Sequence, residues 1–412
     1  MKEYWLLLES YVFLWSNASQ MVIYNSLSGQ GYLFNNTNEL KQIIVQLENK
    51  ENLYCTSINE SDFQNASIRE FVNFIRENYC GDIFDKSLFP QKPLVVIPDL
   101  HIDNEKFRSD EKALFDVNVY KWYVEKNLLE LTIYLTGNCT LDCKDCNTAC
   151  KQIKWCQKNE SFLSKETVFE LLNQVKYTSL FEVKFLGGNI FQLPYWEELI
   201  EELKSYRFKK SFYCDYRLMP TDKKQLEIFE DEDFQLNILV DLSGFKQEVS
   251  RDFLEGKDRF CYIFKVSSSE EYEEVCRIIE EEKIEATIFP FYNGNNLLFF
   301  EELVFQNTDD ILNTPWSKNE LFAHKVINTN SFGKFTISSK GEIYDNIYNK
   351  PIGTIEDDIK DITIKTLKEG KAWFETRDKV IPCKDCIYKY LCPSPSNYEL
   401  VLGRNNLCHV KS

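Results

Sequence analysis

Histidine and positive charge are scarce in this sequence, and long apolar runs are missing. Three histidines occur (His101, His324 and His409), which argues against a histidine-based catalytic or zinc site. Lysine and arginine total 48 against 65 aspartates and glutamates, giving a net charge of −17. Nucleic acids and anionic membranes are therefore disfavoured as main partners, because both require a positive surface. No run of roughly 18 apolar residues is present, so we expect no transmembrane helix.

Targeting and nucleotide-binding signals are also missing. Glu9 interrupts the apolar stretch at the N-terminus, so we expect no cleavable signal peptide and a cytoplasmic location. The segment Leu186-Gly187-Gly188-Asn189 is not followed by the Gly-Lys-Ser/Thr of a phosphate-binding loop. No internal repeat or low-complexity tract is evident.

Cysteine is what the sequence does have, with 14 in 412 residues. Nine of them fall in two tight groups, at Cys139, Cys143, Cys146, Cys150 and Cys156, and at Cys383, Cys386, Cys392 and Cys408. Disulfide scaffolds are usually shorter, with cysteines spread more evenly. Clusters in a chain with 43% apolar residues, long enough for about three domains, indicate metal sites instead.

The first part of the chain, residues 1–92, is predicted to be a small α+β module. Tyr4–Trp15 is rich in aromatic and apolar residues and predicts a strand. Strands followed by helices in so short a unit are typical of a winged-helix module. Residues 93–129 are predicted to form a connector with one helix near Phe115–Leu128.

Residues 130–305 alternate strand, loop and helix. Expected strands are centred on Leu131–Leu135, Val183–Leu186, Phe212–Tyr216, Leu236–Leu242, Cys261–Val266 and Glu285–Phe291. This alternation predicts an α/β fold with a parallel sheet, arranged as an open or partial (β/α)6 barrel. Chemistry in such folds lies at the carboxyl ends of the strands, where the first cysteine group follows Leu135.

The first cysteine group has the spacing C-x3-C-x2-C, formed by Cys139, Cys143 and Cys146. Three thiolates on one short loop can hold three irons of a cubane and leave the fourth iron open to a small molecule. A zinc site and three free thiols are the alternatives. Cys150 and Cys156 are expected to be packed free thiols, with extra ligands or a redox pair as the other interpretations.

With Gly187-Gly188 after the next strand, this motif resembles the radical S-adenosylmethionine (SAM) superfamily. The resemblance implies that Cys139, Cys143 and Cys146 ligate a 4Fe-4S cluster whose open iron binds SAM. It also implies that Gly187, Gly188 and Asn189 line the methionine site of SAM. Two positions depart from the family pattern: Asn189 stands where the family has glutamate, and Asp145 where it has an aromatic residue.

The second group lies in residues 306–412, where Lys334–Ile337 and Glu342–Tyr344 predict a hairpin. Its C-x2-C-x5-C spacing followed by a last cysteine is similar to the SPASM extension of radical SAM peptide maturases. That likeness implies one auxiliary 4Fe-4S cluster on Cys383, Cys386, Cys392 and Cys408. Ser396 and Asn346 stand where a second auxiliary cluster would need cysteines, so that cluster is predicted to be lost. The four thiolates also suit zinc.

The N-terminal module resembles the recognition element that binds a leader peptide as an added strand in ribosomal peptide pathways. As a whole, the chain resembles radical SAM/SPASM peptide maturases. More narrowly, it is similar to the pseudo-radical-SAM proteins of Bacteroidales peptide-modification systems. Three hypotheses follow: an enzyme that cleaves SAM, a degenerate partner that binds precursor peptide and an active maturase, and a zinc-binding structural protein.

Overall fold

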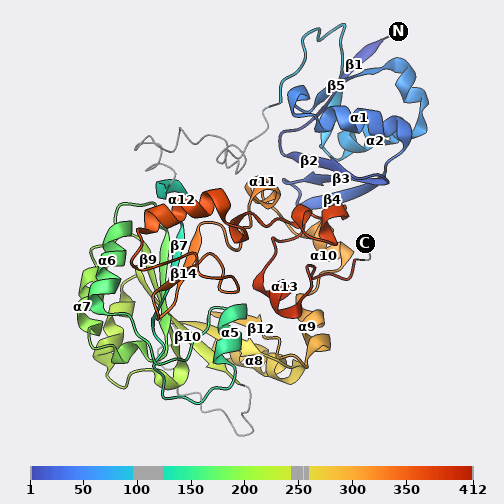
Figure 1. The fold of residues 1–412 in the computed structure, drawn as a ribbon. Helices are drawn as coiled ribbons and strands as arrows, with labels where there is room; N and C mark the ends of the chain where they lie inside the picture. The colour runs from blue at the N-terminus through green and yellow to red at the C-terminus, as the bar shows by residue number, and fades with distance from the viewer. Residues whose placement is uncertain (1, 96–123, 243–253, 255–258, 411–412) are drawn as a thin grey trace.

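The computed structural model describes residues 2–95, 124–242, 254 and 259–410. Its strands form three sheets: two three-stranded sheets near the N-terminus and one nine-stranded sheet in the centre. The fold is mixed α/β with a large, mainly parallel sheet, as the sequence predicted (Figure 1). None of the helices in the described residues is both long and apolar enough to cross a membrane.

The N-terminal module is built from six strands and two long helices. In chain order these are β1 (Glu3–Leu8), β2 (Val12–Ser16), β3 (Gln20–Asn25), β4 (Gln30–Asn35), α1 (Asn38–Glu48), β5 (Cys55–Asn59), α2 (Ala66–Glu77) and β6 (Gly81–Asp85). One sheet has the order β5-β1-β6 and the other β2-β3-β4, and all of their pairs are antiparallel. The predicted α+β composition is therefore present.

The expected strand over Tyr4–Trp15 is divided in the structure. A turn at 9–11 separates β1 from β2, and the two strands then join different sheets. Glu9 and Ser10 explain the break, because their polar side chains interrupt the apolar run and the amide of Val12 bonds back to the carbonyl of Glu9 at 3.0 Å. The winged-helix assignment stays a prediction, since β5 and β6 add strands that the sequence did not indicate.

The central sheet contains six parallel strands in sequential order. They are β7 (Glu130–Thr136), β8 (Glu182–Gly187), β9 (Lys209–Asp215), β10 (Phe234–Asp241), β11 (Cys261–Val266) and β12 (Ala286–Pro290). Each lies within a few residues of a strand expected from the sequence. The parallel sheet is thus confirmed, while its description as a partial barrel stays a prediction.

Alternation along each strand gives the sheet two different faces. On β7, Leu131, Ile133 and Leu135 are fully buried and belong to the main hydrophobic core. That core includes side chains of three helices, α6 (Lys165–Val175), α7 (Trp196–Leu203) and α8 (Ser269–Glu282). The opposite face carries Glu130 and Thr132 together with a second buried cluster that includes Tyr134, Leu186 and Leu239.

The C-terminal part of the chain extends the same sheet. Strand β13 (Lys334–Ile337) lies parallel to β7, and β14 (Glu342–Tyr344) returns antiparallel to it, which confirms the predicted hairpin. Strand β15 (Gly353–Thr354) closes this edge. The other α-helices in the described residues are α5 (Cys146–Gln152), α9 (Leu297–Val304), α10 (Thr308–Asn313), α11 (Lys318–Val326), α12 (Ile359–Glu369) and α13 (Asn397–Leu402).

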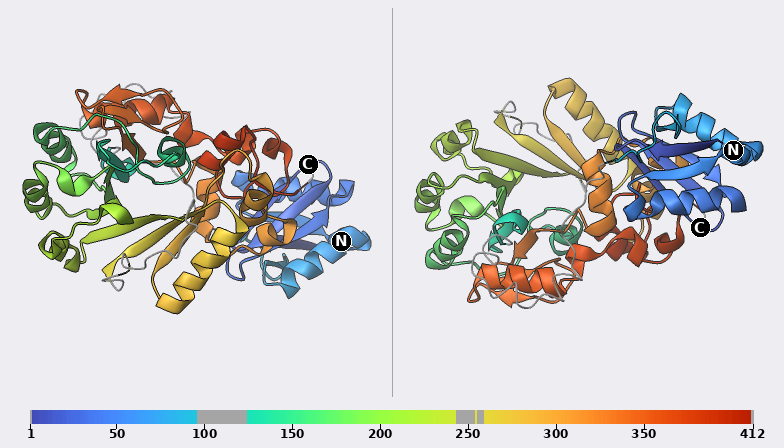
Figure 2. Two further views of the ribbon diagram at one scale, coloured as in Figure 1. Left: turned by 90° about the horizontal axis from the view of Figure 1, so that it is seen from below. Right: turned by 90° about the horizontal axis from the view of Figure 1, so that it is seen from above.

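The N-terminal module packs against the cysteine-bearing end of the chain (Figures 1 and 2). Phe13, Trp15 and Tyr24 are buried in a cluster that also contains Ile387 and Leu391. The indole of Trp15 donates a hydrogen bond to the carbonyl of Ile387. The aromatic residues of β2 are therefore interior. The helix predicted near Phe115–Leu128 lies mostly outside the described residues.

Candidate functional site

The cysteine loop leaves the carboxyl end of β7 and lies against the Gly187-Gly188 turn at the end of β8. The amide of Gly188 donates to the carbonyl of Thr136 at 2.8 Å, and the amide of Asn189 to the carbonyl of Asn138 at 2.9 Å. A Cβ atom on Gly188 would lie 1.8 Å from the carbonyl oxygen of Asn138. Glycine is therefore needed for the loop to approach this closely.

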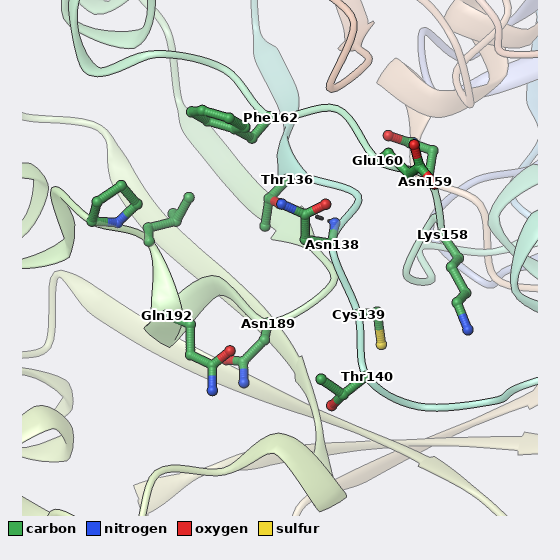
Figure 3. A pocket seen from close by; sticks show the side chains of 12 residues that line it. Thr136, Asn138, Cys139, Thr140, Lys158, Asn159, Glu160, Phe162, Asn189 and Gln192 are labelled. Carbon is green, nitrogen blue, oxygen red and sulfur yellow. Dashed lines mark hydrogen bonds between the residues drawn. The ribbon is translucent and has the colours of Figure 1, made fainter.

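Cys139 lies on one side of this loop, at a cavity of about 730 Å³. Figure 3 shows Asn189 and Gln192 next to one another in this cavity, with Cys139 on the loop. The side-chain oxygen of Asn189 is buried and has no hydrogen-bond partner among the described residues. Such an acceptor is costly to leave unpaired, so this position suits a ligand that donates a hydrogen bond.

Cys143 and Cys146 pack in a different cluster of side chains from Cys139, together with Cys156. The sulfur atoms of Cys146 and Cys156 are 3.4 Å apart, and the hydrogen bond from Cys156 lowers the pKa of Cys146. No sulfur contact joins Cys139 to either of these thiols within the described residues. The structure thus brings together two of the three predicted ligands and adds Cys156, a residue that the sequence left as a packed thiol.

Two cations, each bound to a carboxylate, lie near Cys143 and Cys146. Arg217 donates through Nη2 to Cys143 Sγ at 3.0 Å and is bound by Asp215 through two hydrogen bonds of 2.7 and 2.8 Å. Asp215 is only 2% exposed, and its hydrogen bonds raise the pKa of Arg217 above the ordinary value. A cation fixed in this way offsets the negative charge of thiolates.

Lys265 is the second cation. It is 2% exposed, and its ammonium lies 2.7 Å from Asp241 Oδ2 and 3.6 Å from Asp145 Oδ2. Asp145 directly precedes Cys146, so this ion pair connects β11 to the cysteine loop. The signal that could have revealed both cations was present in the sequence, because Asp215, Asp241 and Lys265 stand at or near the ends of parallel strands.

The described residues contain no group of three cysteine, histidine or acidic side chains arranged around a single metal ion. Thiolates bound to one zinc ion at about 2.3 Å would lie about 3.8 Å from each other. A cubane distributes its thiolates over different iron atoms, so its ligands need not converge on one point. Soft thiolates beside fixed cations suit an iron–sulfur cluster more closely than a bare ion.

The second cysteine group surrounds a buried arginine. Arg377, which is 5% exposed, donates through Nε to the carbonyl of Pro393 at 2.7 Å and through Nη1 to the carbonyl of Asn405 at 3.0 Å. Its other nitrogen pairs with the buried Glu399. These bonds connect the segments that carry Cys392 and Cys408.

All four thiols of this group interact with one another. Burial raises the pKa of Cys383, Cys386 and Cys392, and repulsion between the thiolates of the group adds to the shift. Cys408 contributes to that repulsion in each case. The four predicted ligands are thus within electrostatic reach of one another, although within the described residues no three of them converge on a single metal position.

The two positions predicted to have lost a cysteine are occupied by hydrogen-bonded polar residues. Ser396 caps α13, and its hydroxyl bonds to Glu399 Oε2 at 2.6 Å. Asn346 donates to Asn397 Oδ1 at 2.7 Å. Both side chains are thus engaged with protein groups.

The remaining cysteines have no metal-site geometry in the described residues. Cys150 is buried, which raises its pKa to about 12, and its thiol contacts the carbonyl of Asn147. Cys55, Cys80 and Cys214 are buried single thiols, and none of the described cysteines forms a disulfide. Burial of Cys150 agrees with the expectation that it is a packed free thiol.

Comparison with known proteins gives one match by sequence. Residues 129–255 match a family model described as a 4Fe-4S single cluster domain. This segment begins at β7 and includes the cysteine loop, the Gly187-Gly188 turn and Arg217. No curated protein matches the chain.

Several solved structures are similar to the chain. Streptococcus suis SuiB bound to its precursor peptide SuiA is 12% identical, with a TM-score of 0.45, and the alignment covers 98% of both chains. SuiB bound to S-adenosylmethionine is 13% identical, with a TM-score of 0.43, covering 98% of this chain and 97% of that one. His-tagged anSMEcpe with bound AdoMet is 16% identical, with a TM-score of 0.44, covering 64% and 84%. Correspondences this loose do not decide function.

Proposed function

We propose that the chain is an iron–sulfur protein of the radical SAM/SPASM type that acts in the maturation of a ribosomally made peptide. The observation that carries this proposal is the position of the cysteine loop. It lies at the carboxyl edge of a parallel sheet, held against Gly187-Gly188 by two backbone hydrogen bonds. The match of residues 129–255 to a 4Fe-4S domain model supports the same assignment.

In this proposal Cys139, Cys143 and Cys146 hold a 4Fe-4S cluster. When bound, a cluster of this type supplies the electron that cleaves SAM. Arg217 and Lys265 provide the fixed positive charge beside Cys143 and Cys146. Cys139 would be the third ligand, and it packs against a different cluster of side chains from Cys143 and Cys146.

The SAM methionine would lie against Gly187, Gly188 and Asn189. The unpartnered oxygen of Asn189 is an acceptor available to an ammonium group. A hydrogen bond between the SAM ammonium and a carboxylate would contribute on the order of 1.5–3 kcal/mol to binding. The amide of Asn189 carries no charge, so it supplies only part of that contribution. SAM would therefore bind more weakly than at a carboxylate.

Cys383, Cys386, Cys392 and Cys408 would hold a second, auxiliary 4Fe-4S cluster. Four thiolates leave no open corner, so this cluster would relay an electron or position the peptide. Arg377 lies among the ligand-bearing segments and offsets part of their negative charge. A zinc ion on the same residues is the third-ranked alternative.

The precursor peptide is the proposed partner of residues 1–92, in a leader-binding role. Strand β4 pairs with β3 alone within the described residues, so its outer edge has no strand partner and is the proposed place of strand addition. On β2, by contrast, the amides of Leu14 and Ser16 already bond to the side chains of Tyr54 and Glu48. Neither nucleic acid nor a membrane is proposed as a partner of a chain with a net charge of −17.

The second candidate function is a catalytically degenerate partner of an active maturase, like the pseudo-radical-SAM proteins of Bacteroidales peptide systems. Three observations favour it: Asn189 replaces the acid, Asp145 pairs with Lys265, and Cys139 lies apart from the other two thiols. Such a chain would keep the scaffold and the peptide site without cleaving SAM.

Anaerobic reconstitution with iron and sulfide counting tests the proposal. We expect Cys139→Ala/Cys143→Ala/Cys146→Ala to lose one cubane's worth of iron, because the C-terminal cysteines are untouched. Cys55→Ala/Cys214→Ala is the matched control and should lose none. Wild-type protein without iron would overturn the assignment, and bound zinc would promote the structural alternative.

The same reconstituted protein separates the two leading functions. An active enzyme produces 5′-deoxyadenosine from SAM under dithionite. A protein that holds both clusters but forms no 5′-deoxyadenosine is a degenerate partner.

A further inference from the structure

A second cavity, of about 320 Å³, lies on the concave face of the sheet between β13 and the C-terminal segment. Its walls include Tyr134 of β7, Phe289 of β12 and Tyr398 of α13. Two lysines, Lys154 and Lys334, also line it. It is separate from the cavity that contains Cys139 and Asn189, and the proposed function assigns nothing to it.

The two lysines have few partners of opposite charge. Lys154 donates to the hydroxyl of Thr132 at 2.8 Å, but its nearest carboxylate contact, to Glu130 Oε1, is 3.7 Å. Lys334 donates to the carbonyl of Thr329 at 3.3 Å, and no ion pair reaches it within the described residues. An ammonium group has three donors, so each lysine keeps donor capacity beyond these contacts.

The nearby glutamates are engaged by another lysine. Lys184 lies 2.7 Å from Glu130 Oε2 and 3.2 Å from Glu182 Oε2. Glu182 also accepts a hydrogen bond from the hydroxyl of Ser211. Three lysines thus share two glutamates in this part of the described structure, and the shorter contacts all belong to Lys184.

One more acid, Asp345, lines the same cavity, but its carboxylate is hydrogen-bonded to neighbouring protein groups and not to the two lysines. It is 7% exposed, and its two oxygens accept from the Asn349 side chain at 3.0 Å and the Ala372 amide at 3.4 Å. No ion pair joins Asp345 to Lys154 or Lys334 in the part of the chain described. Its charge is therefore stabilised without the two lysines.

Burial lowers the pKa of both lysines, which means that their charged forms are incompletely stabilised. Desolvation lowers the pKa of Lys154 to about 8; attraction to Glu130 opposes this shift, and repulsion from Lys184 and Lys334 adds to it. Desolvation also lowers the pKa of Lys334. A bound anion would offset both shifts, because it adds negative charge to that of Glu130, whose contact with Lys154 is 3.7 Å long.

We propose that this cavity binds a carboxylate group, held between the ammonium groups of Lys154 and Lys334. A volume of about 320 Å³ accommodates a side chain or a small organic acid, and not a folded segment. The carboxylate comes either from a free small acid or from an acidic residue of a peptide. The peptide source rests on the proposed function, whereas carboxylate binding itself requires neither a cluster nor SAM.

Calorimetric titration of the full chain with matched probes tests this site. N-acetylglutamate amide and N-acetylglutamine amide have the same shape and differ in charge, and glutarate represents a free small acid. We expect the glutamate derivative to bind and the glutamine derivative to bind at least about tenfold more weakly, because only the former gains charge-assisted hydrogen bonds. Stronger binding of glutarate than of the glutamate derivative would identify a free acid as the ligand.

Lys154→Gln and Lys334→Gln should each weaken binding of the acidic probe about tenfold or more, and Lys334→Arg should retain most of it. Lys340→Gln is the matched control, because Lys340 is exposed at the hairpin turn and should leave binding unchanged. Circular dichroism of each variant establishes that it is folded. Equal binding of the acid and amide probes, or equal binding by K154Q, K334Q and wild type, overturns the proposal. Either result leaves the iron content, and so the proposed function, untouched.

Discussion

At the loop that carries Cys143, a guanidinium group lies directly against a sulfur atom. Arg217 reaches the thiol at 3.0 Å while two hydrogen bonds to the buried Asp215 fix its orientation. Hydrogen bonds to ligand sulfur and nearby charge are among the factors that set the potential of an iron–sulfur cluster. Arg217 is therefore a positioning residue that is expected to tune the proposed cluster.

Substitution Arg217→Gln should make the reduction potential of the loop cluster more negative. The cation stabilises the reduced, more anionic cluster more than the oxidised one, so its loss disfavours reduction. The expected shift is on the order of 60 mV, which corresponds to about 1.4 kcal/mol for one electron. Redox titration followed by electron paramagnetic resonance measures it.

Arg207→Gln is the control for that titration, since Arg207 is exposed and removes the same charge from the chain. An unchanged potential in R217Q, with iron content equal to wild type, would contradict the assigned role. Arg217→Lys should shift the potential less than R217Q does, because lysine keeps the positive charge but cannot form the two hydrogen bonds to Asp215.

At the scale of elements, helix α11 places a lysine at the contact between the N-terminal module and the cysteine-rich segment. Lys325 lies 5.0 Å from the ring centre of Tyr390 and 5.8 and 5.9 Å from those of Trp15 and Phe13. Burial lowers its pKa to about 8. The contact is stable although one of its members is a poorly solvated cation, so apolar packing must supply the difference.

Lys325→Met should therefore raise the free energy of unfolding at pH 7 by on the order of 1–3 kcal/mol. The gain is partly offset because Glu48, whose pKa is raised by burial, loses a nearby cation. Chemical denaturation of the two proteins at several pH values measures the difference.

The sign of its pH dependence follows from the two protonation states. Between pH 8 and about 10.4 the unfolded chain keeps a proton on Lys325 that the folded chain has released, so the stability of the wild type rises with pH in that window. The advantage of K325M should consequently be largest below pH 8 and shrink toward pH 10. An advantage that does not change with pH would show that Lys325 is solvated.

At the scale of the whole molecule, the first and last parts of the chain form one packed unit. Trp15 of β2 and Ile387 between two candidate ligand cysteines are joined by a hydrogen bond across 372 positions of sequence. Tyr24 adds bonds to the backbone of Thr314 at 2.8 Å and Trp316 at 2.7 Å. The proposed peptide-binding module is thus mechanically connected to the proposed auxiliary cluster.

Trp15→Ala should destabilise both the N-terminal module and the segment around Ile387, because the tryptophan packs between them. Removing a buried tryptophan typically costs about 3–5 kcal/mol, and here the Ile387 carbonyl also loses its donor. We expect a lower unfolding midpoint and, in the same variant, loss of iron from the C-terminal site with the loop site retained. Calorimetry and iron counting after limited proteolysis measure these effects.

Trp5→Ala provides the comparison, because Trp5 is less buried and bonds to Phe89 within its own part of the chain. It should lower the stability of the module without changing iron content. Equal iron loss in W5A and W15A would mean that the contact is not specific.

Several particular elements could be predicted from local sequence. The hairpin at Lys334–Ile337 and Glu342–Tyr344 has the predicted bounds, and each expected parallel strand is present. The division between β1 and β2 was not foreseen, because the two halves of Tyr4–Trp15 have similar composition and differ only in which sheet they join.

What the sequence by itself determined was the alternation of strands and helices, the spacing of the two cysteine groups, and the glycine turn beside the first. These depend on residues close together in the chain, whose periodicity and backbone freedom act locally. What only the tertiary structure decided was which distant groups meet: Arg217 with Cys143, Cys156 with Cys146, and Lys154 with Lys334 at one cavity. Parallel strands bring their ends and one face together across long stretches of sequence, and no local pattern specifies which side chains then face each other.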